Sequence, residues 1–190
     1  MNLLFFDTET TGLPRNFRAP ASDLKNWPRM IQVAWLVMDM NGKELRGAEH
    51  IIKPSGFTIP ADAAKIHGIT TEIALNKGVE LKPVLDALCR DVLDASQLIA
   101  HNVAFDEKIV GAELIRNGLP NHFETKPRKC TMLSSTKYCA LPGNYGNKWP
   151  KLQELHKKLF GQTFEGAHNA LADVRACAKC FFKMQQIGII

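Results

Sequence analysis

This chain of 190 residues has none of the usual marks of a membrane or secreted protein. No apolar run approaches the roughly 20 residues that a membrane-spanning helix needs. The N-terminus has no charged segment followed by a longer apolar stretch, so we expect no signal peptide. Its five cysteines are scattered and odd in number, which argues against a disulfide framework and is typical of a reducing compartment. We therefore expect a cytoplasmic protein with no membrane partner.

Repeats, low-complexity tracts and linkers are also absent, and we predict one domain over residues 1–190. A single CxxC, Cys177 and Cys180, lies within an amphipathic helical pattern and has no second pair nearby. Because a structural zinc site needs four ligands, we predict plain helical packing for these two thiols. The formal net charge is only +5, so the charge permits a polyanionic partner without requiring one.

The periodicity of apolar residues predicts an α/β fold. An Asn41-Gly42 turn should join the second and third strands as an antiparallel hairpin. Strands are expected at 2–7, 30–39, 45–54, 97–102 and, as a short edge strand, 128–132. Helices are expected at 82–95, 105–118, 151–161 and 166–188. The proline-bearing segments 13–28 and 141–150 should be loops, the first at the mouth of any site. This order indicates a mixed sheet with helices on its faces.

Two acids end the first apolar strand, in the stretch "LLFFDTETTG". Residues two apart in a strand point to the same face, so Asp7 and Glu9 should converge. Two bare carboxylates at that distance repel, and a divalent cation such as Mg²⁺ or Mn²⁺ removes the conflict. A solvated strand end followed by a turn is the simpler alternative for this pair alone.

Two later stretches carry further acids and histidines. "HNVAFDEKIV" places Asp106 in the first turn of a helix that follows a strand, where it can lie opposite Asp7 or simply favour the helix dipole. In "HNALADV", His168 precedes Asp173 by five residues, about 140° apart on a regular helix. If His168 lies before the helix or in its first turn, with Gly166 supplying freedom, it can still reach a site that Asp173 lines. An exposed histidine near a helix start and an acid on the polar face of the helix are the simpler alternative for either residue alone.

Taken together, "FDTETTG", "HNVAFD" and "HNALAD" resemble the three motifs of the DEDDh (DnaQ-like) 3′–5′ exonucleases, which have a ribonuclease H-like fold and include the proofreading epsilon subunit of bacterial replicase. "IHGIT", residues 66–70, resembles a substrate-side segment of the same family. The resemblance spans residues 7–173. The position that is tyrosine in another branch of the family is Asn169 here, which identifies the histidine type.

The resemblance implies a role for each matching residue. Asp7, Glu9 and Asp173 would hold a first divalent ion, and Asp7 would bridge to a second ion near Asp106. His168 would be the general base and would not be a metal ligand. Residues expected around the terminal nucleotides are Thr10, Leu13, His67, Asn102 and Phe105. The product would be a nucleoside 5′-monophosphate, released by a two-metal-ion reaction with Mg²⁺ or Mn²⁺.

The expected substrate is the 3′ end of single-stranded DNA, as in replication proofreading or repair. An exoribonuclease of the same fold and a catalytically silent nucleic-acid-binding module remain alternatives, because no residue can be shown to accept or reject a 2′-hydroxyl. The resemblance does not extend to the tail by which an epsilon subunit binds its polymerase. A stand-alone nuclease is the simpler expectation, and a polymerase partner and the oligomeric state stay open.

Overall fold

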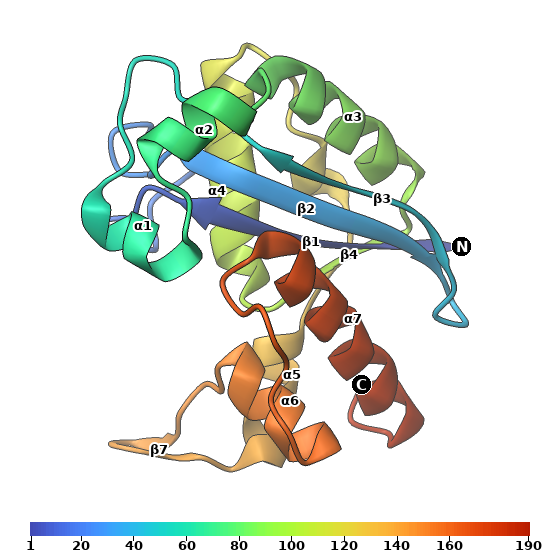
Figure 1. The fold of residues 1–190 in the computed structure, drawn as a ribbon. Helices are drawn as coiled ribbons and strands as arrows, with labels where there is room; N and C mark the ends of the chain where they lie inside the picture. The colour runs from blue at the N-terminus through green and yellow to red at the C-terminus, as the bar shows by residue number, and fades with distance from the viewer.

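A mixed five-stranded sheet forms the centre of the fold, and the computed structural model describes all residues from 1 to 190 (Figure 1). The strand order is β3-β2-β1-β4-β5. The central strand β1 (Asn2–Thr10) pairs antiparallel with β2 (Met30–Asp39) and parallel with β4 (Gln97–Ala100). The edges are β3 (Glu44–Ile51), antiparallel to β2, and β5 (Arg128–Cys130), parallel to β4.

Helices cover both faces of this sheet, which explains why β1 is apolar on both sides. Leu4 and Phe6 pack into one core cluster with residues of α3 (Leu81–Asp94) and α4 (Val103–Arg116). Leu3 and Phe5 pack on the opposite face against α7 (Ala170–Gln186). The other elements are α1 (Ala61–His67), α2 (Thr71–Lys77), the 3₁₀ helix η1 (His122–Thr125), α5 (Thr131–Cys139), β6 (Pro142–Gly143), β7 (Gly146–Asn147) and α6 (Leu152–Phe160).

The central strand extends beyond its parallel neighbour. β4 pairs with β1 only through Leu3, Leu4 and Phe5, and it ends at Ala100. The chain then turns into α4, so the last residues of β1 have no strand on that side. The carboxyl ends of β1 and β4 therefore share one sheet edge, where the start of a helix lies beside an open strand end.

The expected elements are present, but several bounds differ. The strands expected at 45–54 and 97–102 end at Ile51 and Ala100, and the helix expected at 166–188 spans Ala170–Gln186. Segment 128–132 is a strand only to Cys130, because Thr131 and Met132 begin helix α5. The expected loop 141–150 contains the small β6-β7 hairpin. Helices α1, α2 and α5 were not expected, because they are only 7 to 9 residues long and bury few side chains. All five cysteines are free, and Cys177 and Cys180 are buried in helix packing as predicted.

None of the helices is both long enough and apolar enough to cross a lipid bilayer.

Candidate functional site

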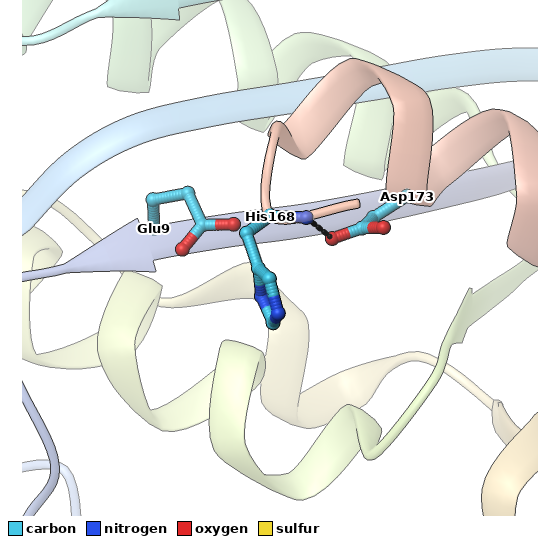
Figure 2. Close-up of side chains that lie close together, drawn as sticks. All are labelled: Glu9, His168 and Asp173. Carbon is cyan, nitrogen blue, oxygen red and sulfur yellow. Dashed lines mark hydrogen bonds between the residues drawn. The ribbon is translucent and has the colours of Figure 1, made fainter. Parts of the chain in front are cut away.

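The carboxyl end of β1 carries the acids that the sequence singled out. Asp7 and Glu9 alternate with Phe6 and Thr8 along the strand, so they face α7 together with Leu3 and Phe5. Glu9, His168 and Asp173 each place one ligand atom within 4.8 Å of the other two, as Figure 2 shows. Segments far apart in the sequence thus meet at one point, and they bring two carboxylates and an imidazole together.

His168 lies just before α7, which removes the angular conflict expected within a helix. Its φ of 68° is left-handed, and Gly166, with φ of 75°, forms the turn that precedes it. The backbone N–H of His168 donates to Oδ2 of Asp173 at 3.1 Å (Figure 2). The exposed imidazole therefore projects over the site while Asp173 approaches from the first turn of the helix.

The start of α7 is held by side chains that the sequence analysis did not identify. Asn169 caps the helix by accepting from the N–H of Ala172, and its amide donates to Glu49 on β3. The amide of buried Gln32 on β2 accepts from the N–H of Ala170 and also donates to Glu49. Strands β2 and β3 and the start of α7 are joined in this way. Because Gln32 lies opposite Glu9 in the sheet, the segment carrying His168 is fixed relative to β1. Only Asn169 had a recognisable signal, as a residue type that favours helix N-caps.

Asp106 closes the site from the side of α4. It is only 3% exposed, and its Oδ1 accepts from the backbone N–H of Thr8 at 2.9 Å and from the Thr8 hydroxyl at 2.7 Å. These bonds form on the side of β1 where, beyond the end of β4, no neighbouring strand pairs with it. Thr8 was not expected to take part, although it lies between the two acids in the sequence.

The electrostatics of these acids are those of a site that needs a cation. Burial raises the pKa of Asp7 well above its usual range, and Asp106, Asp173 and Glu9 raise it further. Burial, with help from Asp173 and Asp106, raises the pKa of Glu9 to about 8. Burial also raises the pKa of Asp106 to about 7 against its bonds from Thr8, and that of Asp173 to about 6.

A divalent metal ion fits this set of donors. The chain's seven ion pairs involve none of the four carboxylates. A buried cluster of hard oxygen donors without a basic partner is typical of a Mg²⁺ or Mn²⁺ site. The imidazole of His168 belongs to the same group of candidate ligand atoms as Glu9 and Asp173. It therefore lies close enough to share a metal ion with them, whereas the resemblance implies a base that is not a ligand.

Of the five residues expected around the substrate, His67 and Asn102 offer free polar groups. Nδ1 of His67 accepts from the N–H of Ile69 at 3.1 Å, so Nε2 carries the proton, and this buried atom has no partner. Burial is the main cause that lowers the pKa of His67, and the backbone of Thr10 acts in the opposite direction. Asn102 is half-buried in a left-handed conformation, and its side chain makes no hydrogen bond.

The other three differ in how accessible they are. Leu13 is exposed in the segment that follows β1. Phe105 is half-buried, with its ring 6.4 Å from those of Phe17 and Trp27. Thr10 is buried, and its hydroxyl donates to the Gly12 carbonyl at 2.6 Å, so it shapes the turn after β1.

Comparison with known proteins agrees with this geometry. Residues 4–181 match the Exonuclease family, RNase_T. The chain belongs to this family. The exonuclease is 29% identical over 187 residues to the DNA polymerase III subunit epsilon of Treponema pallidum, an alignment that covers 94% of the exonuclease and 74% of that subunit. It is also 29% identical over 180 residues to the uncharacterized exonuclease CP81 of Escherichia phage 186, of which it covers 82%.

Solved structures show the same fold. Exonuclease I of E. coli, in a zinc-bound complex with single-stranded DNA, superposes with a TM-score of 0.75 at 22% identity over 98% of the exonuclease. Exonuclease I of Methylocaldum szegediense gives a TM-score of 0.70 at 22% identity over 97%. The exonuclease spans only 40% of each of these chains. The predicted ribonuclease H-like fold and DEDDh type are confirmed, and the protein is a 3′–5′ exonuclease that depends on divalent metal ions.

Proposed function

We propose that residues 1–190 form one exonuclease domain that removes 5′-mononucleotides from the 3′ end of single-stranded DNA. The observation that carries the proposal is the convergence of Glu9, His168 and Asp173 within 4.8 Å, beside two further buried acids. The choice of DNA is supported by relatives whose names refer to a DNA polymerase subunit and to a complex with single-stranded DNA.

In this proposal the carboxylates of Asp7, Glu9 and Asp173 hold one Mg²⁺ or Mn²⁺ ion, and Asp7 with Asp106 holds a second. Such ions supply a more acidic water and stabilise negative charge on the phosphate. Thr8 keeps Asp106 oriented and partly offsets the effect of burial on its pKa. Without these two bonds Asp106 would be protonated more readily and would bind a cation less well.

His168 acts as the general base. It takes a proton from the attacking water while the water oxygen bonds to phosphorus and the bond from phosphorus to the 3′ oxygen breaks. The 3′ oxygen takes up a proton from solvent, so the shortened strand leaves with a 3′-hydroxyl, and the released nucleotide keeps the phosphate on its 5′ oxygen.

His67 and Asn102 position the terminal nucleotide. The free Nε2–H of His67 is a donor for a phosphate or sugar oxygen, and the unpaired amide of Asn102 offers both a donor and acceptors. Leu13 and Phe105 provide apolar contacts with the bases, which accept any sequence. Thr10 contributes through the turn that places Leu13.

The test is degradation of matched DNA and RNA single strands, each labelled at the 5′ end, with Mg²⁺, with Mn²⁺ and with EDTA. We expect stepwise shortening of DNA, release of 5′-mononucleotides and no reaction in EDTA. Preferential loss of the RNA strand would replace DNA by RNA as the substrate. Cutting of a circular single strand would contradict the exonuclease proposal itself.

A further inference from the structure

A small hairpin projects from the molecule between α5 and α6, at the lower left of Figure 1. We call residues 141–149 the arm. β6 and β7 pair through Pro142 with Asn147 and Gly143 with Gly146, which leaves Tyr145 in the two-residue turn. Gly143 cannot be replaced without a shift, because a Cβ there would lie 2.9 Å from the Gly146 carbonyl oxygen. The sequence thus builds a narrow ribbon that carries its turn away from the core.

The arm presents two large aromatic rings to solvent. Tyr145 is fully exposed and Trp149 is 64% exposed. Neither ring packs against another aromatic side chain, and neither belongs to a core cluster. Single exposed apolar residues are ordinary, but two aromatic rings within five residues of one protruding ribbon indicate an interaction surface.

The base of the arm is fixed to the catalytic edge of the sheet. The carbonyl of Pro150, the residue after Trp149, accepts from Nε2 of His101 at 2.9 Å. His101 directly follows β4 and precedes Asn102, and its Nδ1 lies 3.0 Å from the Thr131 hydroxyl. Figure 1 shows α1 beside the end toward which β1 points, and the arm on the same side of the molecule, below that end. A single strand of nucleic acid whose 3′ end lies at the metal site can therefore run past the arm.

The charge of this part of the chain suits a polyanion. Residues 131–160, which form α5, the arm and α6, contain five lysines and one acid, Glu154, whereas the whole chain has a net charge of only +5. Lys148, in the arm, pairs with Glu154, and no ion pair involves Lys151 just beyond it. Basic side chains around exposed aromatic rings are the features with which proteins hold single-stranded nucleic acid.

We propose that the arm binds the substrate strand on the 5′ side of the nucleotides held at the metal site, with Tyr145 and Trp149 stacked on its bases. The proposal rests on the function proposed above, because it assumes that the strand's 3′ end lies among the carboxylates. Stacking accepts every base, so the arm would add affinity and length dependence without adding sequence preference.

The experiment compares a long and a minimal substrate. The arm is tested with single-stranded DNA of increasing length, from dinucleotides to about 16 nucleotides. The longest strand matches the upper site size of single-strand binding domains. The p-nitrophenyl ester of thymidine 5′-monophosphate reaches only the metal site. Tyr145→Ala/Trp149→Ala is compared with Tyr145→Phe/Trp149→Phe, which keeps both rings, and with Leu45→Ala, an exposed apolar control on β3. Affinity is also measured by fluorescence anisotropy in EDTA, where no DNA is consumed.

The double alanine variant should bind long strands about tenfold or more weakly, raise KM to match, and leave kcat/KM for the ester unchanged. The double phenylalanine variant and Leu45→Ala should behave as wild type. Equal affinity of wild type and the double alanine variant for long strands would overturn the proposal, as would an equal loss in the phenylalanine variant. If the wild type cleaved neither substrate, the proposed function would fail, while the affinity comparison would still decide the role of the arm.

Discussion

At the scale of single residues, the proposed role of His168 as the general base can be tested by substitution. His168→Ala should lower kcat by about 10²- to 10⁴-fold, because the water would lose its proton acceptor. The exposed ring packs in no core cluster, so the melting temperature in EDTA should change little. Pre-steady-state hydrolysis of a labelled strand measures the loss, with His122→Ala on η1 as the control histidine.

The imidazole lies within 4.8 Å of the carboxylates, so metal affinity has to be measured for the same variant. If His168 is only a base, Mn²⁺ affinity by calorimetry should stay close to that of wild type. Unchanged kcat in His168→Ala would remove the residue from the mechanism. A kcat that recovers fully at saturating Mn²⁺ would make His168 a ligand instead.

Thr8 gives a second prediction at this scale. Thr8→Val keeps the shape of the side chain and removes the hydroxyl that donates to Asp106 at 2.7 Å, so the pKa of Asp106 should rise further. Metal affinity at neutral pH should fall by about 10- to 100-fold, the usual effect of removing a partner of a metal ligand. Thr8→Ser should keep most of the affinity. Equal Mn²⁺ affinity in the valine and serine variants would show that the hydroxyl does not matter.

At the scale of elements, the start of α7 links stability to activity. Asn169→Ala removes the cap on Ala172 and the bond to Glu49, and it should lower the free energy of unfolding by about 0.5–2 kcal/mol. It should also lower kcat, because His168 is the preceding residue. Asn169→Ser keeps a capping oxygen and should recover most of the stability. Urea unfolding and kcat are measured on both variants, and a fully active alanine variant would show that the cap does not position His168.

At the scale of the whole molecule, the acid cluster makes metal-free stability depend on pH. Glu9 and Asp173 have folded-state pKa values of about 8 and about 6, above the ordinary values of about 4. Between the ordinary value of about 4 and these raised values, the folded chain binds more protons than the unfolded chain. The free energy of unfolding should therefore fall as pH rises from about 5 to 8. His101, whose pKa burial lowers to about 4, acts in the opposite sense below pH 6.5.

The comparison with Asp7→Asn separates these effects, since both proteins contain His101. The variant lacks one of the repelling acids, so in EDTA its stability should fall less steeply with pH and should not lie below that of wild type at about pH 8. Urea titrations across this range give the slopes. Identical slopes for the two proteins would mean that Asp7 is not part of the repelling cluster.

A divalent metal ion should offset this loss of stability, because it binds the folded site and hardly the unfolded chain. Mn²⁺ at about 100 times its Kd should add roughly 2.7 kcal/mol to the stability of wild type. Asp7→Asn should lose most of that gain, since the proposed bridging ligand is weakened. Thermal melts with EDTA and with Mn²⁺ provide the measurement. An equal rise in both proteins would show that Asp7 is not a principal ligand.

The convergence of Asp7 and Glu9 could be predicted from local spacing, whereas the roles of Asp106, His168 and Asp173 came from the resemblance to the exonuclease motifs. Asp7 and Glu9 converge by the period of a strand, and His168 and Asp173 are five residues apart. The sequence did not predict the bonds of Thr8 to Asp106, which depend on where β4 stops relative to β1. The Gln32–Glu49 support of α7 was missed for the same reason, since it joins residues brought together only by strand register. Their roles as ligand, base or substrate contact stay predictions.

The sheet order has a consequence for protein synthesis. Within residues 1–190, the central strand with Asp7 and Glu9 is synthesised long before His168, which precedes α7, and before Asp173 in that helix. At about 5–20 residues per second, the interval is roughly ten to thirty seconds. During that time the nascent chain has Asp7 and Glu9 without Asp173 or His168, so the proposed metal site and the proposed general base would be incomplete and no hydrolysis is expected. Docking of α7 completes the active site and the second face of the core in one step.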